Sequence, residues 1–461
     1  MKALIIAMMV VFLVFPAAVE AGVAAPGWMY HGGPDHTGVY DDGGVHTTIS
    51  GLWNYTIGKG MISSLAISNG TIYGASIDGK LCAIDGTTGR ELWNRTIGDA
   101  DLESTPAVYD GIVYIGNWNG TVYALDAATG EQIWGYDTGD SVISSPAVSN
   151  GIVYAGSYDR NVYALDAATG RRIWSYRTGG CVGSSPAVSN GIVYAGCADG
   201  AVYAIDASSG TLKWKFITGA SVWASPAVAD GLVYIGSFDS NVYALNATTG
   251  KKVWFYRTNG TIDTCPAVTN EAVFIGCDDG SVYALNAATG ALLWNFRPGS
   301  NNGFGGGPDL MRVSPVVVNG IVYIMYDRCS MHAETHTYPE DSMFHGESYT
   351  EYIIENKNST ISALDAFTGL QVWNRSIDIL ASGYWMPSMS SPVMANGILY
   401  VGTCDGSVHA IGSLPEPAET QAPVTGTATE QKPSQTPFAG IEGLITIALA
   451  AIVYARLLRK K

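Results

Sequence analysis

The sequence predicts an all-β protein, a single eight-bladed β-propeller built from four-stranded antiparallel blades. Three observations lead to this prediction. A ten-residue phrase, LDAATGEQIW at residues 125–134, recurs in close variants along the chain. The units that carry the phrase are about forty residues long, a period typical of propeller blades. The 56 glycines and 26 tyrosines indicate many short strands joined by tight turns.

The repeated phrase follows the pattern A-x-[DN]-x-x-[TS]-G-x-x-x-W, in which the final tryptophan is the largest side chain. A small four-stranded sheet buries both of its faces only when neighbouring sheets stack on it. We therefore expect the tryptophan rings to pack between blades. The copies of the pattern end at Trp93, Trp134, Trp174, Trp214, Trp254, Trp294 and Trp373.

Residues 144–179 illustrate one unit. Asn150-Gly151 predicts a two-residue hairpin turn between the first and second strands, because both residue types tolerate positive φ. Asp166 follows the third strand and is expected to accept hydrogen bonds from the N–H groups of the next turn. Gly170 is expected to adopt the left-handed conformation there. A fourth strand, which carries the tryptophan, completes the unit.

The two ends of the repeat predict how the ring closes. An eighth unit begins near the C-terminus but runs into a Pro/Thr-rich segment before its last strand. Residues 52–58, LWNYTIG, form a last strand without the three strands that normally precede it. We expect the strand of Trp53 to pair with the strand around Val408–Ile411, which removes the open sheet edges. The propeller is predicted to span residues 22–411.

The chain ends predict export and membrane attachment. Residues 1–21 combine a lysine, a short apolar run and a small-residue exit, which is typical of a secretory signal peptide. Residues 412–437 are predicted to be a Pro/Thr-rich linker, residues 438–455 a membrane-spanning or sorting segment, and residues 456–461 a basic cytoplasmic end. We expect the propeller to be exported to the cell surface and anchored in the membrane at its C-terminus.

The C-terminal tail resembles the archaeal surface-protein sorting signal, in which a Pro-Gly-Phe motif precedes an apolar span and a basic end. In this chain Pro437-Phe438 stands in that place without the intervening glycine. The alternative is a plain membrane anchor.

The net charge of −16 argues against nucleic acid as a partner, because an acidic surface repels phosphate backbones. Seven cysteines are an odd set for an exported chain. Cys181 with Cys197, and Cys265 with Cys277, each flank one predicted hairpin and are candidate disulfides.

Asn-x-Ser/Thr sequons fit an exported glycoprotein. Asn246 stands at the turn position that aspartate fills elsewhere and is expected to be unmodified. The sequons begin at Asn54, Asn69, Asn94, Asn119, Asn246, Asn259, Asn358 and Asn374.

The repeat pattern resembles the pyrroloquinoline-quinone (PQQ) repeat family over roughly residues 28–411, and the opening WMYHGGPDHTG is similar to the segment that usually precedes the family's blades. The resemblance implies the propeller of quinoprotein alcohol dehydrogenases and of an outer-membrane assembly lipoprotein with the same blades. A quinoprotein dehydrogenase implies a calcium ion held by acidic and amide side chains, a catalytic aspartate and usually adjacent cysteines over the cofactor.

Those enzyme residues have no counterparts in this sequence. No two cysteines are adjacent, and the blades lack the long loops that enclose an enzyme pocket. The repeated aspartates are interpreted as turn formers at Asp85, Asp126, Asp166, Asp206 and Asp365. We expect a non-catalytic binding or scaffold propeller with no catalytic residues and no cofactor. A PQQ-dependent dehydrogenase is the alternative.

The candidate binding residues lie where the units differ. The turns between second and third strands, together with the segments leading to the first strands, are expected on one face of the ring. Exposed aromatic rings beside charges are typical of protein or sugar contacts, so an extracellular protein or a polysaccharide is the expected partner. The alternative is that these residues cap the ring. They are Trp118, Tyr158, Arg160, Trp223, Phe238 and Asp239.

The largest departure from the repeat is an insertion at residues 327–358 in the seventh blade. If it forms a hairpin that turns at Glu340-Asp341, opposite residues pair His336 with His345 and Glu334 with Glu347. A divalent metal such as zinc is then a possible ligand. The alternative is a solvated acidic loop. The candidate metal ligands are His332, Glu334, His336, His345 and Glu347.

Overall fold

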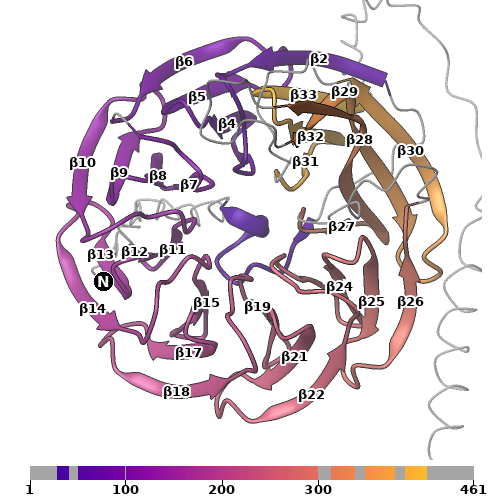
Figure 1. The fold of residues 1–461 in the computed structure, drawn as a ribbon. Coiled ribbons are helices and arrows are strands. Elements are labelled where there is room, and N and C mark those ends of the chain that lie inside the picture. Colours follow the sequence, from indigo (N-terminus) through magenta and orange to yellow (C-terminus); the bar gives the residue numbers. More distant parts are fainter. Residues whose placement is uncertain are drawn as a thin grey trace, which may run out of the picture. The chain divides into compact units, whose positions relative to one another are not determined.

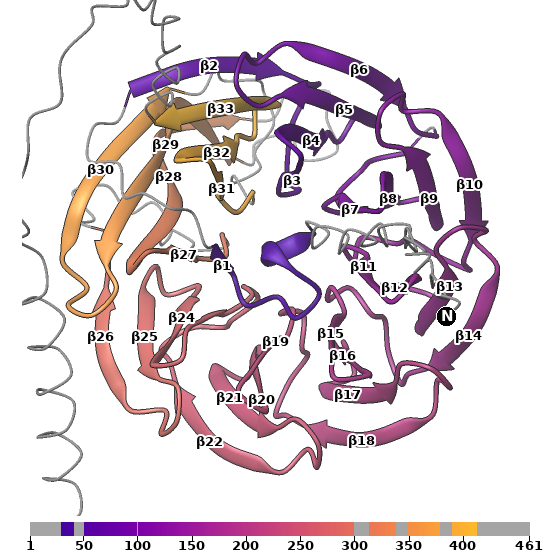
Figure 2. The same ribbon diagram turned by 180° about the vertical axis from the view of Figure 1, so that it is seen from behind.

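A computed structural model shows an all-β ring of eight blades around a central axis (Figures 1 and 2). Each blade contains four antiparallel strands, and one blade carries a short fifth strand at its inner edge. The eight-bladed propeller predicted from the repeat is confirmed. The structure describes residues 29–40, 50–98, 100–298, 313–337, 348–378 and 390–412.

The predicted signal peptide at residues 1–21 lies outside the described residues. The same holds for the predicted linker beyond Gly412, the apolar segment at residues 438–455 and the basic end. Within the described ranges, no helix is both long and apolar enough to cross a membrane.

Blades are numbered in chain order, so that blade 1 begins with β3 and blade 8 ends the ring. The innermost strands of blades 1 to 8 are β3 (Ala66–Ser68), β7 (Ala107–Tyr109), β11 (Ala147–Ser149), β15 (Ala187–Ser189), β19 (Ala227–Ala229), β23 (Ala267–Val268), β27 (Val316–Val318) and β31 (Val393–Ala395). The second strands are β4 (Thr71–Ala75), β8 (Ile112–Gly116), β12 (Ile152–Gly156), β16 (Ile192–Gly196), β20 (Leu232–Gly236), β24 (Ala272–Gly276), β28 (Ile321–Thr337) and β32 (Ile398–Gly402).

The outer half of each blade follows the same order. The third strands are β5 (Lys80–Asp85), β9 (Thr121–Asp126), β13 (Asn161–Asp166), β17 (Ala201–Asp206), β21 (Asn241–Asn246), β25 (Val282–Asn286), β29 (Ser348–Asp365) and β33 (Ser407–Gly412). The outermost strands are β6 (Glu91–Thr96), β10 (Gln132–Asp137), β14 (Arg172–Arg177), β18 (Leu212–Ile217), β22 (Lys252–Arg257), β26 (Leu292–Phe296), β30 (Gln371–Asp378) and, in blade 8, β2 (Ser50–Thr56).

The ring closes through β2, which comes from the N-terminal side of the chain and pairs with the C-terminal β33. The pairing is antiparallel and sets Trp53 opposite Ala410 and Tyr55 opposite Val408. The predicted closure of the ring by the strand of Trp53 is confirmed. The outer edge of β33 is therefore covered by a paired strand, and blade 8 has its four strands.

The local turns have the predicted chemistry. Asn150 and Gly151 both have positive φ, at 52° and 72°, in the hairpin between β11 and β12. The Asp166 carboxylate accepts hydrogen bonds from the Thr169 backbone N–H (2.9 Å) and hydroxyl (2.6 Å). Gly170 follows with φ of 70°. These short-range contacts explain why Asp, Thr and Gly recur at fixed spacing.

The repeat tryptophans pack between blades, and for seven of them the described residues also show an indole hydrogen bond to the next blade. In blade 2, the Trp134 Nε1–H donates to the Ala167 carbonyl of blade 3 (2.9 Å), and the Tyr114 hydroxyl donates to the same carbonyl (3.1 Å). The Trp134 ring also lies against Gly170 of blade 3, where a Cβ would be 2.7 Å from the ring. The corresponding indole bonds join Trp53 to Gly86, Trp93 to Ala127, Trp174 to Ala207, Trp214 to Ala247, Trp254 to Ala287 and Trp294 to Ala366.

A second set of contacts joins the blades close to the axis. The Ser145 backbone N–H of blade 3 donates to the Ser185 hydroxyl of blade 4 (2.9 Å). The Ser391 N–H of blade 8 donates to the Ser64 hydroxyl of blade 1 (2.9 Å), so the pattern crosses the closure of the ring. Cys265 holds this position in blade 6. The remaining bonds of the set join Ser64 to Thr105, Thr105 to Ser145, Ser185 to Ser225, Cys265 to Ser314 and Ser314 to Ser391.

Residues 29–40, which we name the axial segment, lie at the centre of the ring (Figures 1 and 2). The segment contains a short 3-10 helix, η1 (Tyr30–Gly32), and ends in β1 (Val39–Tyr40), which pairs in parallel with β27. Its carbonyl groups accept hydrogen bonds from the innermost strands of successive blades. These bonds run from Val188 to Pro34, Val228 to Asp35, Val268 to Thr37 and Val317 to Gly38.

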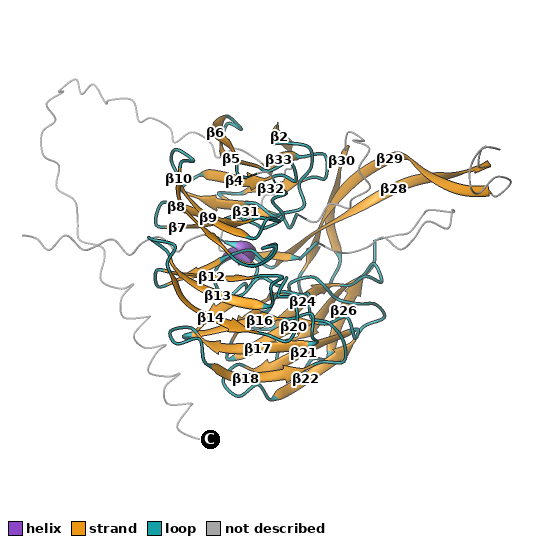
Figure 3. Ribbon diagram, turned by 60° about the vertical axis from the view of Figure 1, so that its left-hand side comes forward, coloured by secondary structure: helices purple, strands orange, loops and turns teal. Residues whose placement is uncertain are grey.

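The insertion in blade 7 forms paired strands, and its register differs from the one expected. β28 and β29 continue as an antiparallel ladder as far as Thr337 opposite Ser348, and they extend beyond the ring (Figure 3). Glu334 lies opposite Glu351 and His336 opposite Tyr349. The expected pairs of Glu334 with Glu347 and of His336 with His345 are therefore wrong.

The disulfide expectation is also wrong. Cys181, Cys197, Cys265 and Cys277 are all free cysteines in the structure, so neither proposed pair is bonded. Cys197, Cys265 and Cys277 are buried and behave as small apolar side chains in the blades.

Candidate binding surface on the rim

Two positions in each unit vary from blade to blade and lie on the same face of the ring. One is in the loop that enters each blade from the preceding one, here called the inter-blade loop, and holds Ile62, Glu103, Ile143, Gly183, Trp223 and Asp263 in blades 1 to 6. The other is in the turn between the second and third strands, here called the 2–3 turn, and holds Ile77, Trp118, Tyr158, Ala198, Phe238 and Asp278. We call these twelve residues the rim; all are half-buried or exposed.

Backbone hydrogen bonds join the two parts of the rim into one surface. The Tyr158 N–H of the 2–3 turn in blade 3 donates to the Ser141 carbonyl of that blade's inter-blade loop (2.9 Å). The Ser141 hydroxyl in turn donates to the Trp118 carbonyl of blade 2 (2.8 Å). The loops of neighbouring blades are therefore held side by side, and their variable side chains meet.

Three predicted rim residues form an aromatic cluster. Trp118 and Tyr158 meet edge-on, with ring centroids 6.3 Å apart. Tyr158 and Trp223 are 5.9 Å apart and tilted by 56°. The Trp118 side chain is 41% exposed, although indole is among the most costly groups to leave in water. The structure thus brings Trp118, Tyr158 and Trp223 together across blades 2 to 5.

Two small residues of blade 4 make this cluster possible. A Cβ on Gly183 would be 2.7 Å from the Trp223 ring and 3.3 Å from the Tyr158 ring, so both rings lie against the glycine. Ala198 takes the aromatic position of the 2–3 turn in the same blade. An alignment of the units shows that Gly183 and Ala198 differ from the residues at the same positions of other blades. A small side chain does not by itself indicate a binding surface.

The cluster lies beside carboxylates that were not singled out in the sequence. Burial raises the pKa of Glu103, and the nearby charge of Asp101 raises it further. A hydrogen bond from the Trp118 indole N–H to the carboxylate opposes this rise. Burial also raises the pKa of Tyr158, and the charges of Glu103 and Asp140 add to that rise. The aromatic rings therefore face negative charge.

The other three predicted residues are not part of the cluster. Phe238 is 36% exposed on the 2–3 turn of blade 5. Asp239 holds the blade together, because its carboxylate accepts hydrogen bonds from the Tyr243 hydroxyl (2.7 Å) and the Gly219 N–H (2.6 Å). Arg160 has positive φ, and its backbone carbonyl accepts a bond from the Thr178 hydroxyl (2.9 Å).

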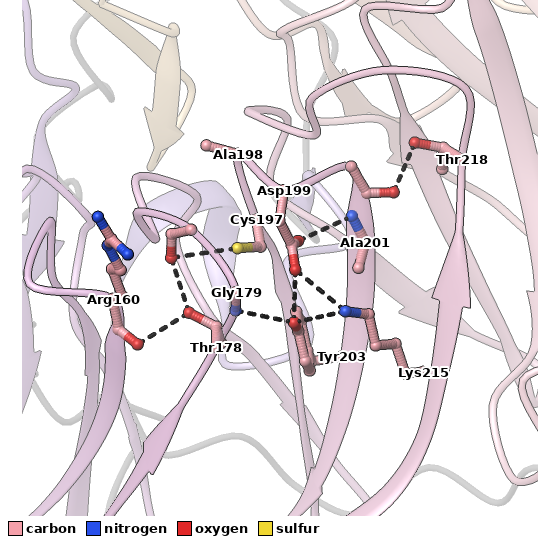
Figure 4. A network of polar contacts seen from close by, with 12 residues as sticks. Arg160, Thr178, Gly179, Cys197, Ala198, Asp199, Ala201, Tyr203, Lys215 and Thr218 are labelled. Atoms are coloured by element: carbon pink, nitrogen blue, oxygen red, sulfur yellow. Dashed lines mark hydrogen bonds and ion pairs between the residues drawn. The ribbon is translucent and has the colours of Figure 1, made fainter.

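Figure 4 shows the network that recurs beneath the rim, in its most elaborate form in blade 4. The Tyr203 hydroxyl donates to the Asp199 carboxylate (2.6 Å) and accepts from the Gly179 N–H of the preceding loop (3.0 Å). Lys215 forms an ion pair with Asp199 at 3.0 Å. The pKa of Asp199 lies below its usual value. Burial alone would raise it, but the hydrogen bonds from Tyr203, Cys197 and Lys215 have the larger combined effect. The network is a blade connection and recurs at Asp159–Tyr163, Asp239–Tyr243 and Asp279–Tyr283.

The axial segment brings two histidines into the centre of the ring, which sequence reasoning did not anticipate. His31 and His36 are buried, and burial lowers their pKa values to about 4 and about 3. His31 Nδ1 lies 3.3 Å from the His36 carbonyl. His31 Nε2 and both ring nitrogens of His36 have no hydrogen-bond partner. Both rings also contact Tyr30, with centroids 5.4 Å apart in each pair.

The residues at the axis do not fit a quinone cofactor, the group that the quinoprotein resemblance implies. The axial segment itself lies there, hydrogen-bonded to the innermost strands of four successive blades. A flat quinone placed on the axis has to displace this segment. The turn aspartates of the repeat, such as Asp166, bind their own turns instead.

The candidate metal ligands of the insertion are only partly described. His332, Glu334 and His336 occupy alternate positions on β28, while His345 and Glu347 lie outside the described residues. Among the side chains that the structure describes, no group of three or more metal-ligating residues is found.

Comparisons with known proteins agree with this architecture. Among solved structures, BamB from Moraxella catarrhalis is similar over 80% of this chain and 98% of its own, with a TM-score of 0.60 and 19% identity. The computationally designed Ika8 protein is similar over 79% of this chain and 99% of its own, with a TM-score of 0.61 and 19% identity. Both likenesses concern the fold. A search of curated protein sequences finds no match.

A family model of β-propellers matches residues 61–413, which is well over half of the chain. The matched range begins after β2 and the axial segment and includes all the other strands. The chain therefore belongs to the family described as the β-propeller of the beta-alanine-activating enzyme.

Proposed function

We propose that this propeller is a non-catalytic binding or scaffold protein that presents its rim to an extracellular protein or polysaccharide. The observation that carries the proposal is the aromatic cluster of Trp118, Tyr158 and Trp223, which lies where the blades differ. Exposed aromatic rings that pack on one another are typical of contact surfaces.

The repeated residues support the same proposal, because their polar groups are used to hold the ring together. The Trp134 and Tyr114 donors share one carbonyl, and the Asp166 carboxylate binds its own turn. Residues in such roles are not available for chemistry on a substrate. The axial segment adds support, since it is hydrogen-bonded to four blades at the centre of the ring and a quinone placed there has to displace it.

The first test is capture of a partner. The purified propeller is immobilised and exposed to native envelope extract and to envelope polysaccharide. We expect retention that is lost in Trp118→Ala and kept in Phe367→Ala, a matched control because Phe367 is 72% exposed in a 3–4 turn, on the other face. Equal retention by both variants would contradict a binding role for the rim.

The second test addresses the competing function, a PQQ-dependent dehydrogenase. Purified protein is supplied with PQQ and calcium and assayed for stoichiometric quinone absorbance and dye-linked alcohol oxidation. We expect neither. Alcohol oxidation that requires both additions would overturn the non-catalytic proposal.

Anchoring at the cell surface is part of the proposal and rests on residues 1–21 and 438–455 of the sequence. We expect deletion of residues 438–461 to release the propeller into the medium, as measured by immunoblotting of medium and membrane fractions. Retention of the truncated protein in the membrane fraction would contradict the anchor.

A further inference from the structure

We propose that the aromatic cluster on the rim binds a basic protein segment, through arginine or lysine side chains held against Trp118, Tyr158 and Trp223. This inference rests on the proposed function and names the chemistry of the partner. It is carried by three features that coincide at one place: aromatic rings in contact, adjacent carboxylates and, among the described residues, no ion pair to those carboxylates.

The aromatic feature is a run of three rings in contact rather than a single ring. Trp118, Tyr158 and Trp223 succeed one another at centroid distances of 6.3 and 5.9 Å. A cation over the face of such a ring is attracted by the negative charge of the π-system, most strongly over tryptophan. Guanidinium groups also stack on these faces, because they are planar and weakly hydrated.

The carboxylates place negative charge beside the aromatic cluster. The Glu103 carboxylate accepts a hydrogen bond from the Trp118 indole, and the charges of Glu103 and Asp140 both raise the pKa of Tyr158. Burial raises the pKa of Glu103, and nearby Asp101 raises it further, so the carboxylate is held in an environment that disfavours its charge. A cation placed there relieves this cost.

Among the described residues, no lysine or arginine forms an ion pair with Glu103 or Asp140. In the described ranges, three lysine–aspartate ion pairs form, at Asp78, Asp206 and Asp199. The chain as a whole carries a net charge of −16. The long-range field therefore favours a basic partner and disfavours an acidic one.

The spacing of the rings favours an extended segment. In a β-strand, residues on one side recur at about 6.7 Å, twice the rise per residue. This distance is close to the two centroid distances in the cluster. Basic residues at alternate positions can therefore place their side chains on successive rings, whereas three consecutive basic residues point to both sides.

The experiment measures peptide binding to the full-length protein by isothermal titration calorimetry at neutral pH. The probe is Ac-Arg-Ser-Arg-Ser-Arg-Ser-NH2. Its isomer Ac-Arg-Arg-Arg-Ser-Ser-Ser-NH2 has the same charge, and a Gln-for-Arg version of the probe has none. We expect the alternating peptide to bind at least about tenfold more tightly than the glutamine version and several-fold more tightly than the isomer.

The variants separate the cluster from the general field of the protein. We expect Trp118→Ala and Glu103→Gln each to weaken binding about tenfold. Phe367→Ala removes an exposed aromatic ring elsewhere, and Asp110→Asn removes an exposed charge in the turn between β7 and β8. We expect both control variants to bind as the parent does.

The outcomes distinguish this inference from the function on which it rests. Equal binding of both arginine isomers, or of Trp118→Ala and parent, would overturn it, because general electrostatics then suffices. Binding of the glutamine version or of a neutral oligosaccharide such as cellohexaose, lost in Trp118→Ala, would also overturn it while leaving the rim as a binding surface. Failure of every probe overturns the basic-segment inference, and the capture experiment then decides the proposed function by itself.

Discussion

Single residues of the repeated phrase each serve the contact between two blades. Gly170 is required twice, by its φ of 70° and by the Trp134 ring that lies where a Cβ would be. Trp134 supplies the ring and a donor to the next blade. The same contact therefore recurs at successive blade boundaries: a tryptophan ring packs on the turn glycine of the next blade, and its indole N–H donates to a carbonyl of that blade.

A glycine substitution separates the two demands on Gly170. Gly151 has nearly the same φ, at 72°, but no atom lies within 4 Å of its would-be Cβ. We expect Gly151→Ala to lower the free energy of unfolding by about 1 kcal/mol. Gly170→Ala should cost at least about 2 kcal/mol more, because the Trp134 ring must also move. Urea denaturation measures both, and equal losses would contradict the contact.

The tryptophan itself gives a second prediction at this scale. We expect Trp174→Ala to lower the free energy of unfolding by about 3–5 kcal/mol, since a buried ring and its bond to Ala207 are both lost. Trp118→Ala, at an exposed rim position, should cost less than about 1 kcal/mol. A Trp174 variant as stable as the Trp118 variant would show that the ring is not a packing element.

At the scale of elements, the axial segment makes the blades unequal, because its carbonyl groups bond to blades 4 to 7. The bonds reach the innermost strands of these blades, and β1 adds a fifth strand to blade 7. The segment joins these blades close to the axis, where each offers a backbone N–H. It also buries two histidines, and three of their four ring nitrogens have no hydrogen-bond partner.

These histidines predict acid sensitivity. Burial lowers the pKa values of His31 and His36 to about 4 and about 3, below the value of about 6.5 for an unfolded chain. Between these values the unfolded chain binds more protons, so the free energy of unfolding should fall as the pH drops from about 6.5 toward 4. The slope is about 1.4 kcal/mol per pH unit for each histidine.

The matching experiment compares denaturation of the parent and of His36→Phe at several pH values in that window. We expect the free energy of unfolding of the variant to change less steeply with pH, by about 1.4 kcal/mol per pH unit, because one titrating histidine is removed. This difference in slope does not depend on the absolute stability of the variant. Identical slopes would contradict a buried, neutral His36.

At the scale of the whole molecule, the ring is closed by two segments from opposite ends of the chain. Thr56 of β2 and Ser407 of β33 bring their hydroxyls to 3.1 Å. Thr360 and Ser376 make the same contact in blade 7, also at 3.1 Å, between neighbouring strands of one hairpin. The two contacts differ chiefly in the length of chain between them, 351 against 16 residues.

Paired cysteine substitutions exploit this difference. We expect a disulfide in Thr56→Cys/Ser407→Cys to raise the free energy of unfolding by about 2–3 kcal/mol more than one in Thr360→Cys/Ser376→Cys, because the longer closed loop loses more entropy when unfolded. Mobility on a non-reducing gel checks that each bond forms, and denaturation with and without reductant measures its effect. If the Thr360→Cys/Ser376→Cys bond forms and the Thr56→Cys/Ser407→Cys bond does not, the pairing of β2 with β33 is contradicted.

The sequence by itself determined the blade, the number of blades and the closure, because each depends on contacts at a fixed spacing. Asp166, Gly170 and the tryptophan lie within one phrase, and Trp53 stands one repeat before the first complete copy. It also pointed to Trp118, Tyr158 and Trp223, since aromatic residues stand out where the repeat varies.

Only the tertiary structure decided the features that lack a period. The axial segment occurs once, and its partners Val188, Val228 and Val268 become neighbours only when the ring is closed. The register of the blade 7 hairpin differs from the expected one: the ladder runs on from the blade as far as Thr337 opposite Ser348, and a bulge between Ser330 and Met331 shifts it on the way. Glu103 and Gly183 join the aromatic cluster because the folding of separate blades, and no local pattern, brings them together.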